Sequence, residues 1–234
     1  MRQTLLIFQK EFKDYFISPI AYIVIAGFLL VIGWIFFSAF FVLGQVDLRT
    51  FFNRLPFLFA LVVPIITMRL FSEELNVGSY ELLLTLPVTF NNIILGKFLA
   101  AVAFVVAILI PTFSYPIFIS FLGDLDWGVV IGSYIGAVLL GAAYAAIGLF
   151  TSSLTRNQII ACITAMVICA VLAIIDKMLF FLPPTLLSVA SYLGAGFHFE
   201  NIAKGIVDTR DLVYFFSVMF LGLYATHLVM QEKK

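Results

Sequence analysis

Long uncharged, apolar runs alternate with short polar segments along this sequence. A helix needs about 20 mostly apolar residues to cross the hydrocarbon core of a bilayer, and five of the runs are long enough. A sixth run, between Arg54 and Arg69, is shorter, but the flanking arginines can extend their side chains to the membrane surfaces. The pattern therefore predicts six spans, over about residues 19–44, 51–71, 92–122, 127–150, 157–176 and 211–231.

The stretch over residues 178–199 is also uncharged, but its composition argues against a complete crossing. Pro183 and Pro184 break a helix early, because the proline ring blocks the preceding turn and removes a hydrogen-bond donor. Gly194 and Gly196 loosen the far end of the stretch. We expect one or two short re-entrant helices in the outer leaflet, over about residues 178–205.

An aromatic stripe, Phe8, Phe12 and Phe16, recurs at helical spacing in residues 1–18. The charged residues of this segment fall on other parts of the helical wheel, which predicts an amphipathic helix that lies in the interface plane. The alternative is a frayed cytoplasmic tail.

The longest loop between spans begins at Arg69 and ends near Lys97, whose side chain is expected to extend to the inner membrane surface. Gly78 and Pro87 bound a helix of about two turns over residues 79–87. Leucines crowd this helix and need either the bilayer or a protein surface; they are Leu82, Leu83, Leu84 and Leu86. The pattern predicts a docking helix for a cytoplasmic partner, or alternatively a turn that packs on its own bundle.

Composition narrows the class further, since 63% of the 234 residues are hydrophobic and only 11% are charged. Soluble domains average about 45–50% apolar and about 25% charged residues, so the chain is expected to be an all-α, polytopic membrane protein in a single domain, residues 1–234. Basic and acidic residues balance at 13 each, which gives no electrostatic footprint for nucleic acid. Cys162 and Cys169 are too few for a disulfide scaffold.

Basic residues favour cytoplasmic loops, and eight of the 13 lie on the cytoplasmic side if the N-terminus is inside. The bias predicts that both termini are cytoplasmic. Charged residues continue to Asp14 before the first apolar run, so no cleavable signal peptide is expected.

The sequence contains little that indicates an ion pathway, a catalytic site or a metal-binding site. No charge lies at the middle of a predicted span, which argues against an ion channel or a proton-driven transporter. His198 and His227 look isolated, no catalytic or metal-binding motif is present, and Gly96-Lys97 lacks the rest of a phosphate-binding loop. We expect no cofactor, and any energy for work must come from another chain. A small-residue stripe, Gly132, Gly136 and Gly141, predicts close helix packing, within the bundle or at a subunit interface.

Several segments in a fixed order match one family. They are residues 18–22, 64–78, 79–89, 95–97, 148–157, 197–199 and 205–211. With these segments the chain resembles the permease subunits of ABC-2 (type V exporter) transporters. Within that superfamily it is most similar to the gliding-motility-associated and multicopper-enzyme-maturation permeases.

The resemblance implies two permeases, identical or homologous, and two copies of a cytoplasmic ABC ATPase in a bacterial inner membrane. Residues 1–18 would be the connecting helix and residues 79–87 the coupling helix. The implied coupling residues are Glu73, Glu74, Gly78, Tyr80, Glu81, Leu82, Leu83, Leu84, Leu86 and Pro87. Glu73 and Glu74 are expected to hold Arg69.

The implied function is ATP-driven movement of an amphiphilic or lipid-like substrate. The alternative is a membrane anchor that does not transport and instead transmits ATPase motion to an envelope or motility partner.

Overall fold

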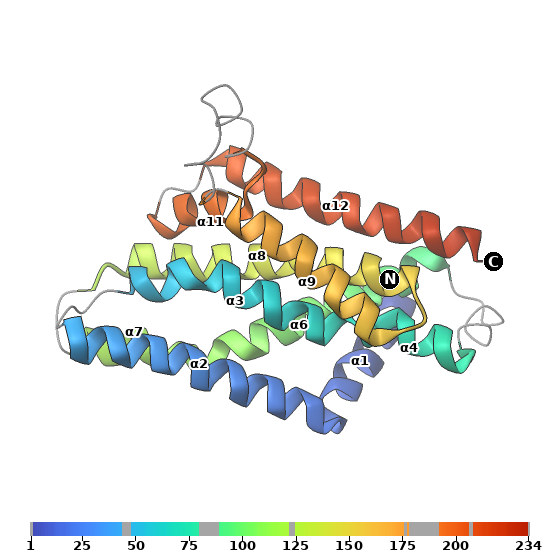
Figure 1. The fold of residues 1–234 in the computed structure, drawn as a ribbon, viewed down its shortest axis with the longest axis horizontal. Coiled ribbons are helices and arrows are strands. Elements are labelled where there is room, and N and C mark those ends of the chain that lie inside the picture. Colours follow the sequence, from blue (N-terminus) through green and yellow to red (C-terminus); the bar gives the residue numbers. More distant parts are fainter. Residues whose placement is uncertain are drawn as a thin grey trace.

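The computed structural model describes residues 2–43, 48–79, 89–121, 125–175, 177, 192–205 and 208–233. Within these ranges the regular structure is entirely helical, which confirms the all-α class. Most of the helices lie side by side in one elongated bundle (Figure 1). Most of the predicted re-entrant region, residues 178–191, lies outside the described residues.

Ten helices are described, and their bounds lie close to those that the apolar runs predict. They are α1 (Arg2–Ile17), α2 (Pro19–Leu43), α3 (Arg49–Thr67), α4 (Arg69–Val77), α6 (Phe90–Thr112), α7 (Ser114–Ser120), α8 (Trp127–Leu154), α9 (Gln158–Ile174), α11 (Ala195–Ala203) and α12 (Thr209–Glu232).

Five helical stretches of the described chain are long and apolar enough to cross a membrane. They are Pro19–Ser38, Phe51–Val77, Phe90–Ser120, Trp127–Leu154 and Thr209–Glu232. The remaining predicted span, over residues 157–176, corresponds to α9, which is apolar but has 17 residues. The structure thus shows five spanning candidates, and the count of six stays a prediction.

Polar residues define where three of these helices begin. The side chain of Asp126 accepts a hydrogen bond from Gly128 N at 2.9 Å at the start of α8. Asn157 and Asp208 cap α9 and α12 in the same way, with bonds of 2.9 and 3.0 Å. Such caps satisfy backbone N–H groups that have no partner within the helix.

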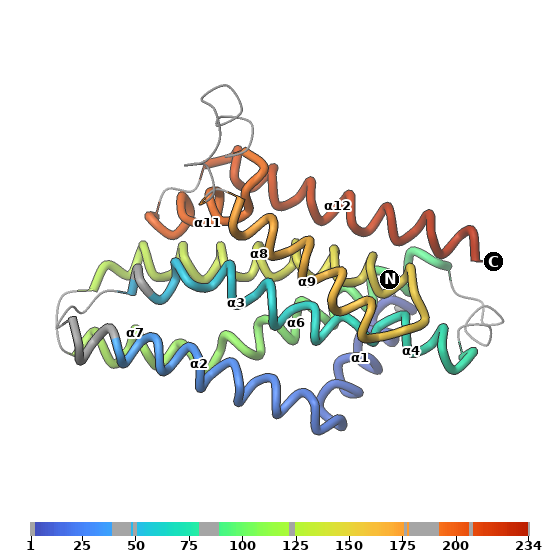
Figure 2. Tube along the Cα trace, viewed as in Figure 1, coloured from blue at the N-terminus to red at the C-terminus, as the bar shows by residue number. Residues whose placement is uncertain are grey.

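Both described ends of the chain lie at the same end of the bundle, which we call the termini end (Figure 2). Thr4 of α1 bonds Asn92 near the start of α6 at 3.2 Å. Near the other terminus, Lys233 donates to the carbonyl of Leu154, the last residue of α8, at 3.4 Å. The termini end therefore also holds the beginning of α6 and the end of α8.

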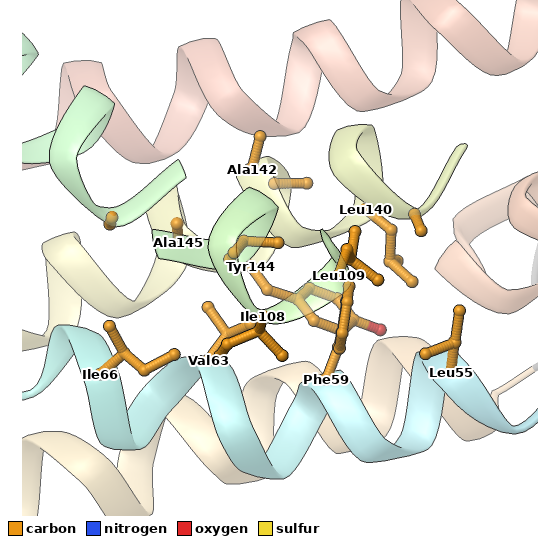
Figure 3. Close-up of a cluster of buried hydrophobic side chains, with 14 of the residues drawn as sticks. Leu55, Phe59, Val63, Ile66, Ile108, Leu109, Leu140, Ala142, Tyr144 and Ala145 are labelled. Atoms are coloured by element: carbon orange, nitrogen blue, oxygen red, sulfur yellow. The ribbon is translucent and has the colours of Figure 1, made fainter. Parts of the chain in front are cut away.

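Helix α8 lies at the centre of the bundle and contacts α3, α4, α6, α9, α11 and α12. Figure 3 shows one layer of this core, in which side chains of α3 point toward those of α6 and α8. Phe59 and Val63 of α3 lie there beside Ile108 and Tyr144, and all four are at most 1% exposed.

Glycines in α8 bring its backbone close to neighbouring helices. A Cβ added at Gly136 would lie 2.9 Å from Ile202 of α11, and one added at Gly141 would lie 2.5 Å from Val105 of α6. A Cβ added at Gly132 would lie 3.4 Å from the carbonyl oxygen of Ile202. All three glycines therefore contact helices of their own chain.

The outward faces of α2 and α12 carry large apolar side chains. Trp34 on α2 and Phe220 on α12 are 78% and 67% exposed. Water would disfavour such surfaces, whereas a lipid environment accepts them.

We expect Gly148→Ala to lower the free energy of unfolding by about 1–3 kcal/mol, the usual effect of overpacking a core. The added Cβ would lie 2.8 Å from Cβ of Thr67, which is fully buried. Thermal unfolding of the purified protein in detergent measures the change.

Gly27→Ala is the matched control, because a Cβ added at Gly27 has no atom within 4 Å. It should leave the stability unchanged or raise it by up to about 1 kcal/mol through helix propensity. Equal melting temperatures for the two variants would contradict the tight packing of α8 against α3.

Candidate functional site

A buried ion cluster joins three helices at the termini end. Lys97 of α6 is only 1% exposed, and its Nζ lies 2.9 Å from Glu11 Oε1 of α1 and 2.7 Å from Glu74 Oε1 of α4. The same ammonium donates to the carbonyl of Leu70 at 2.7 Å. Three acceptors therefore match the three N–H donors of the lysine.

This arrangement corrects two expectations from the sequence. Lys97 does not extend to the membrane surface, because two carboxylates and a carbonyl hold its ammonium inside the protein. Glu74 pairs with Lys97 and not with Arg69. The described residues contain no ion pair between Arg69 and either Glu73 or Glu74.

Arg69 is held by α1 instead. Its guanidinium carbon lies 5.1 Å from the ring centroid of Tyr15, and its Nη2 donates to the carbonyl of Asp14 at 3.4 Å. The Tyr15 hydroxyl in turn donates to the carbonyl of Ile66 in α3 at 3.2 Å. Burial raises the pKa of Tyr15 far above its ordinary value, so the hydroxyl keeps the proton that it donates.

The cluster carries one positive and two negative charges. The side chains of Glu11 and Glu74 are 12% and 14% exposed, so water screens them only in part. Oε2 of Glu74 has no hydrogen-bond partner within the described residues. Exposed Lys10 also lies 3.6 Å from Glu11 Oε1, but Lys97 is the buried cation between the two carboxylates, and the site depends on it.

Helix α1 lies along α6, and its aromatic side chains line this contact. The rings of Phe8 and Phe12 lie 5.8 Å apart, those of Phe12 and Phe16 lie 5.1 Å apart, and Phe16 lies 5.7 Å from Phe104 of α6. All three phenylalanines of α1 are partly buried against the core. Gly96 permits this approach, since an added Cβ would lie 2.8 Å from Ile7.

A hydroxyl from α8 fixes the junction between α3 and α4. Ser152 Oγ accepts hydrogen bonds from the backbone N–H groups of Phe71 and Ser72, both at 3.0 Å, and donates to the carbonyl of Met68 at 2.8 Å. The second span was predicted to end near residue 71, but the helical stretch continues through α4 to Val77.

Gly78 ends α4 with φ +77°, the left-handed conformation that glycine adopts without strain. A cleft of about 460 Å³ lies beside this helix end. Its charged lining includes Lys10 and Asp14 of α1 and Arg69 and Glu73 near α4.

The predicted coupling residues that follow lie outside the described residues. They are Tyr80, Glu81, Leu82, Leu83, Leu84, Leu86 and Pro87. Only Ser79, which lines the cleft, separates the positive-φ glycine from Tyr80, so the predicted coupling segment begins at the cleft.

A second buried polar cluster lies at the opposite end of the bundle, and the sequence expectation missed it. His198 is not isolated, because its Nδ1 lies 2.6 Å from Asp211 Oδ1 and its Nε2 lies 3.0 Å from the carbonyl of Tyr192. Its ring stacks on Tyr214 at 4.1 Å. These contacts tie α11 to the first turn of α12.

The described residues contain no group of three or more His, Cys, Asp or Glu side chains that could hold a metal ion. Their two cysteines are free and buried. We therefore take the ion cluster of Lys97, Glu11 and Glu74, which joins three helices at the termini end, as the candidate functional site.

These helices define an integral membrane protein with five spanning candidates and a charged junction at one end. The family model described as ABC-2 family transporter protein matches residues 5–228, and the chain belongs to this family. No curated protein matches the chain. Family membership makes the chain the membrane component of an ABC transporter, a component that is generally not itself catalytic and that works with an ABC ATPase.

We expect Lys97→Met to lower the free energy of unfolding by about 3–5 kcal/mol, because it leaves two buried carboxylates without their cation. Lys10→Met is the control: the Lys10 side chain is 60% exposed and lies 3.6 Å from Glu11 Oε1, and loss of such an exposed ion pair should change stability by less than about 1 kcal/mol. Thermal unfolding in detergent compares the two variants.

A triple variant separates the effect of charge from that of packing. Adding Glu11→Gln and Glu74→Gln to Lys97→Met removes the uncompensated charges and should restore more than half of the lost stability. If Lys97→Met unfolds at the same temperature as Lys10→Met, the ion cluster does not hold the three helices together.

Proposed function

We propose that the chain is the permease of a type V exporter and moves an amphiphilic or lipid-like substrate with energy from ATP hydrolysed by a separate cytoplasmic subunit. The ion cluster is the observation that carries this proposal. It connects α1 and α4, which line the same cleft as Ser79, to α6, which is part of a spanning candidate. Motion of the coupling segment therefore has a direct path into the membrane helices.

Two contacts define that path. Lys97 links α4 to α6 and α1, and Ser152 links the start of α4 to α8. A displacement of α4 by the ATPase must move these partners or break their bonds. Packed helices with two discrete arrangements transmit such displacements better than flexible loops do.

The proposed topology has six crossings, with both termini in the cytoplasm. Both described ends of the chain lie at the termini end, which requires an even number of crossings. Helix α9 supplies the sixth, since 17 residues extend about 25 Å and lie at the short limit of membrane helices. The basic-residue bias supports the cytoplasmic placement in a bacterial inner membrane.

The proposed assembly contains two permeases, identical or homologous, and two ATPase subunits, with residues 178–205 re-entrant in the outer leaflet. The exposed apolar faces of α2 and α12 suit contact with lipid or with a second permease. The resemblance to gliding-motility and multicopper-enzyme-maturation permeases supports an envelope partner. The apolar spans support an amphiphilic cargo.

Leu83→Asp and Leu84→Asp should each weaken binding of the ATPase about thirtyfold or more, because buried apolar anchors typically contribute about 2 kcal/mol or more to an interface. Glu81→Ala should have a much smaller effect, since a rim charge contributes little. Pull-down of the ATPase from membranes and ATPase activity in reconstituted vesicles measure both effects.

Insertion of each variant into the membrane is the control for folding. If both leucine variants keep assembly and coupled ATPase activity, residues 79–87 do not dock the ATPase and the proposed energy transfer is wrong. If the wild-type complex is coupled but moves no lipid-like substrate in the vesicles, the export role is wrong and the membrane anchor explains the family match.

A further inference from the structure

We infer that a groove at the end of the bundle opposite the termini holds a phospholipid with an anionic headgroup. The groove lies among α2, α3 and the end of α9 and has a volume of about 460 Å³. This inference needs only that the chain spans a membrane and does not depend on the export role.

The groove has an apolar wall and a basic rim. Val31 and Ile35 of α2 face it from one side, and Phe57 and Leu58 of α3 face it from another. Arg54, near the start of α3, and Lys177, just after the end of α9, supply the two charges. The lining contains no Asp or Glu.

The depth of these residues matches the two parts of a lipid. Arg54 lies five residues after the start of α3, about 7.5 Å along the helix, and Lys177 follows the last turn of α9. Both cations are therefore near the level where a bilayer places its headgroups. Val31 lies one helical turn deeper than Ile35, along the direction in which an acyl chain extends.

Charge and exposure favour a lipid over other occupants. Within the part of the chain that the structure describes, no ion pair involves Arg54 or Lys177. Val31 and Phe57 are each 48% exposed, so the groove opens sideways toward the hydrocarbon layer. A lipid that enters from that layer can place its acyl chain against the apolar wall and its phosphate beside the basic rim.

The test measures which lipid the full-length chain retains in mild detergent. The protein is incubated with equal amounts of phosphatidylglycerol and phosphatidylcholine that carry the same acyl chains, and native mass spectrometry counts the bound lipids. Each basic residue near an anionic group strengthens binding about fivefold, so two should give a preference of about 25-fold for phosphatidylglycerol. The double variant Arg54→Gln, Lys177→Gln should retain the two lipids about equally.

Two further variants make the result specific to the groove. Val31→Trp fills the groove without changing its charge and should abolish lipid retention. Arg210→Gln removes an exposed cation outside the groove at the same end of the bundle and should keep the full preference.

Three results would overturn the inference. In the first, neither the double variant nor Val31→Trp changes lipid retention. In the second, Arg210→Gln lowers the preference as much as the double variant does, which indicates general surface charge. In the third, Val31→Trp converts a dimer into a monomer with lipid retention unchanged, which assigns the groove to a second copy of the chain.

Discussion

Lys97 buries an ammonium group between two carboxylates at the point where α1, α4 and α6 meet. Removing such a charge from water costs several kcal/mol, and only close partners with good geometry offset that cost. Here Glu11, Glu74 and a backbone carbonyl supply the partners at 2.7–2.9 Å. Because each acidic side chain comes from a different helix, the lysine stays compensated only while the three helices keep their mutual positions.

The rest of the bundle extends this junction into the membrane. Ser152 of α8 accepts hydrogen bonds from two backbone N–H groups near the start of α4 and so attaches the junction to α8. Helix α8 in turn contacts α3, α6, α9, α11 and α12 through closely packed small residues. A close-packed interior transmits displacement and does not absorb it, since it contains few voids. The ion cluster and the closely packed central helix give the proposed coupling to an ATPase a continuous route from the termini end into the bundle.

Local sequence rules predicted the helices well, because apolar runs and their polar boundaries act over short distances. They could not predict the pairing of Lys97, whose partners lie 86 and 23 residues away. Whether Glu73 or Glu74 faces α6 depends on the rotation of α4, which the contacts of Ser152 help to fix. Local rules also could not predict that His198 pairs with Asp211, because this contact forms only when α11 and α12 lie side by side. The apolar run over residues 157–176 predicted a full span, but its helix, α9, has 17 residues and lies at the short limit for a membrane crossing.

The central claim is that α1 and α4 move as one unit. Pulsed electron–electron double resonance on the complex with its ATPase tests this claim by measuring distances between spin labels. Spin labels replace Lys10 on α1 and Val77 at the end of α4, both of which are exposed. The account predicts the same Lys10–Val77 distance distribution without nucleotide and with trapped ATP. It also predicts that the distance from Val77 to a label at the exposed Val213, near the start of α12 at the opposite end, changes between the two states. A Lys10–Val77 distance that shifts with ATP would contradict the account.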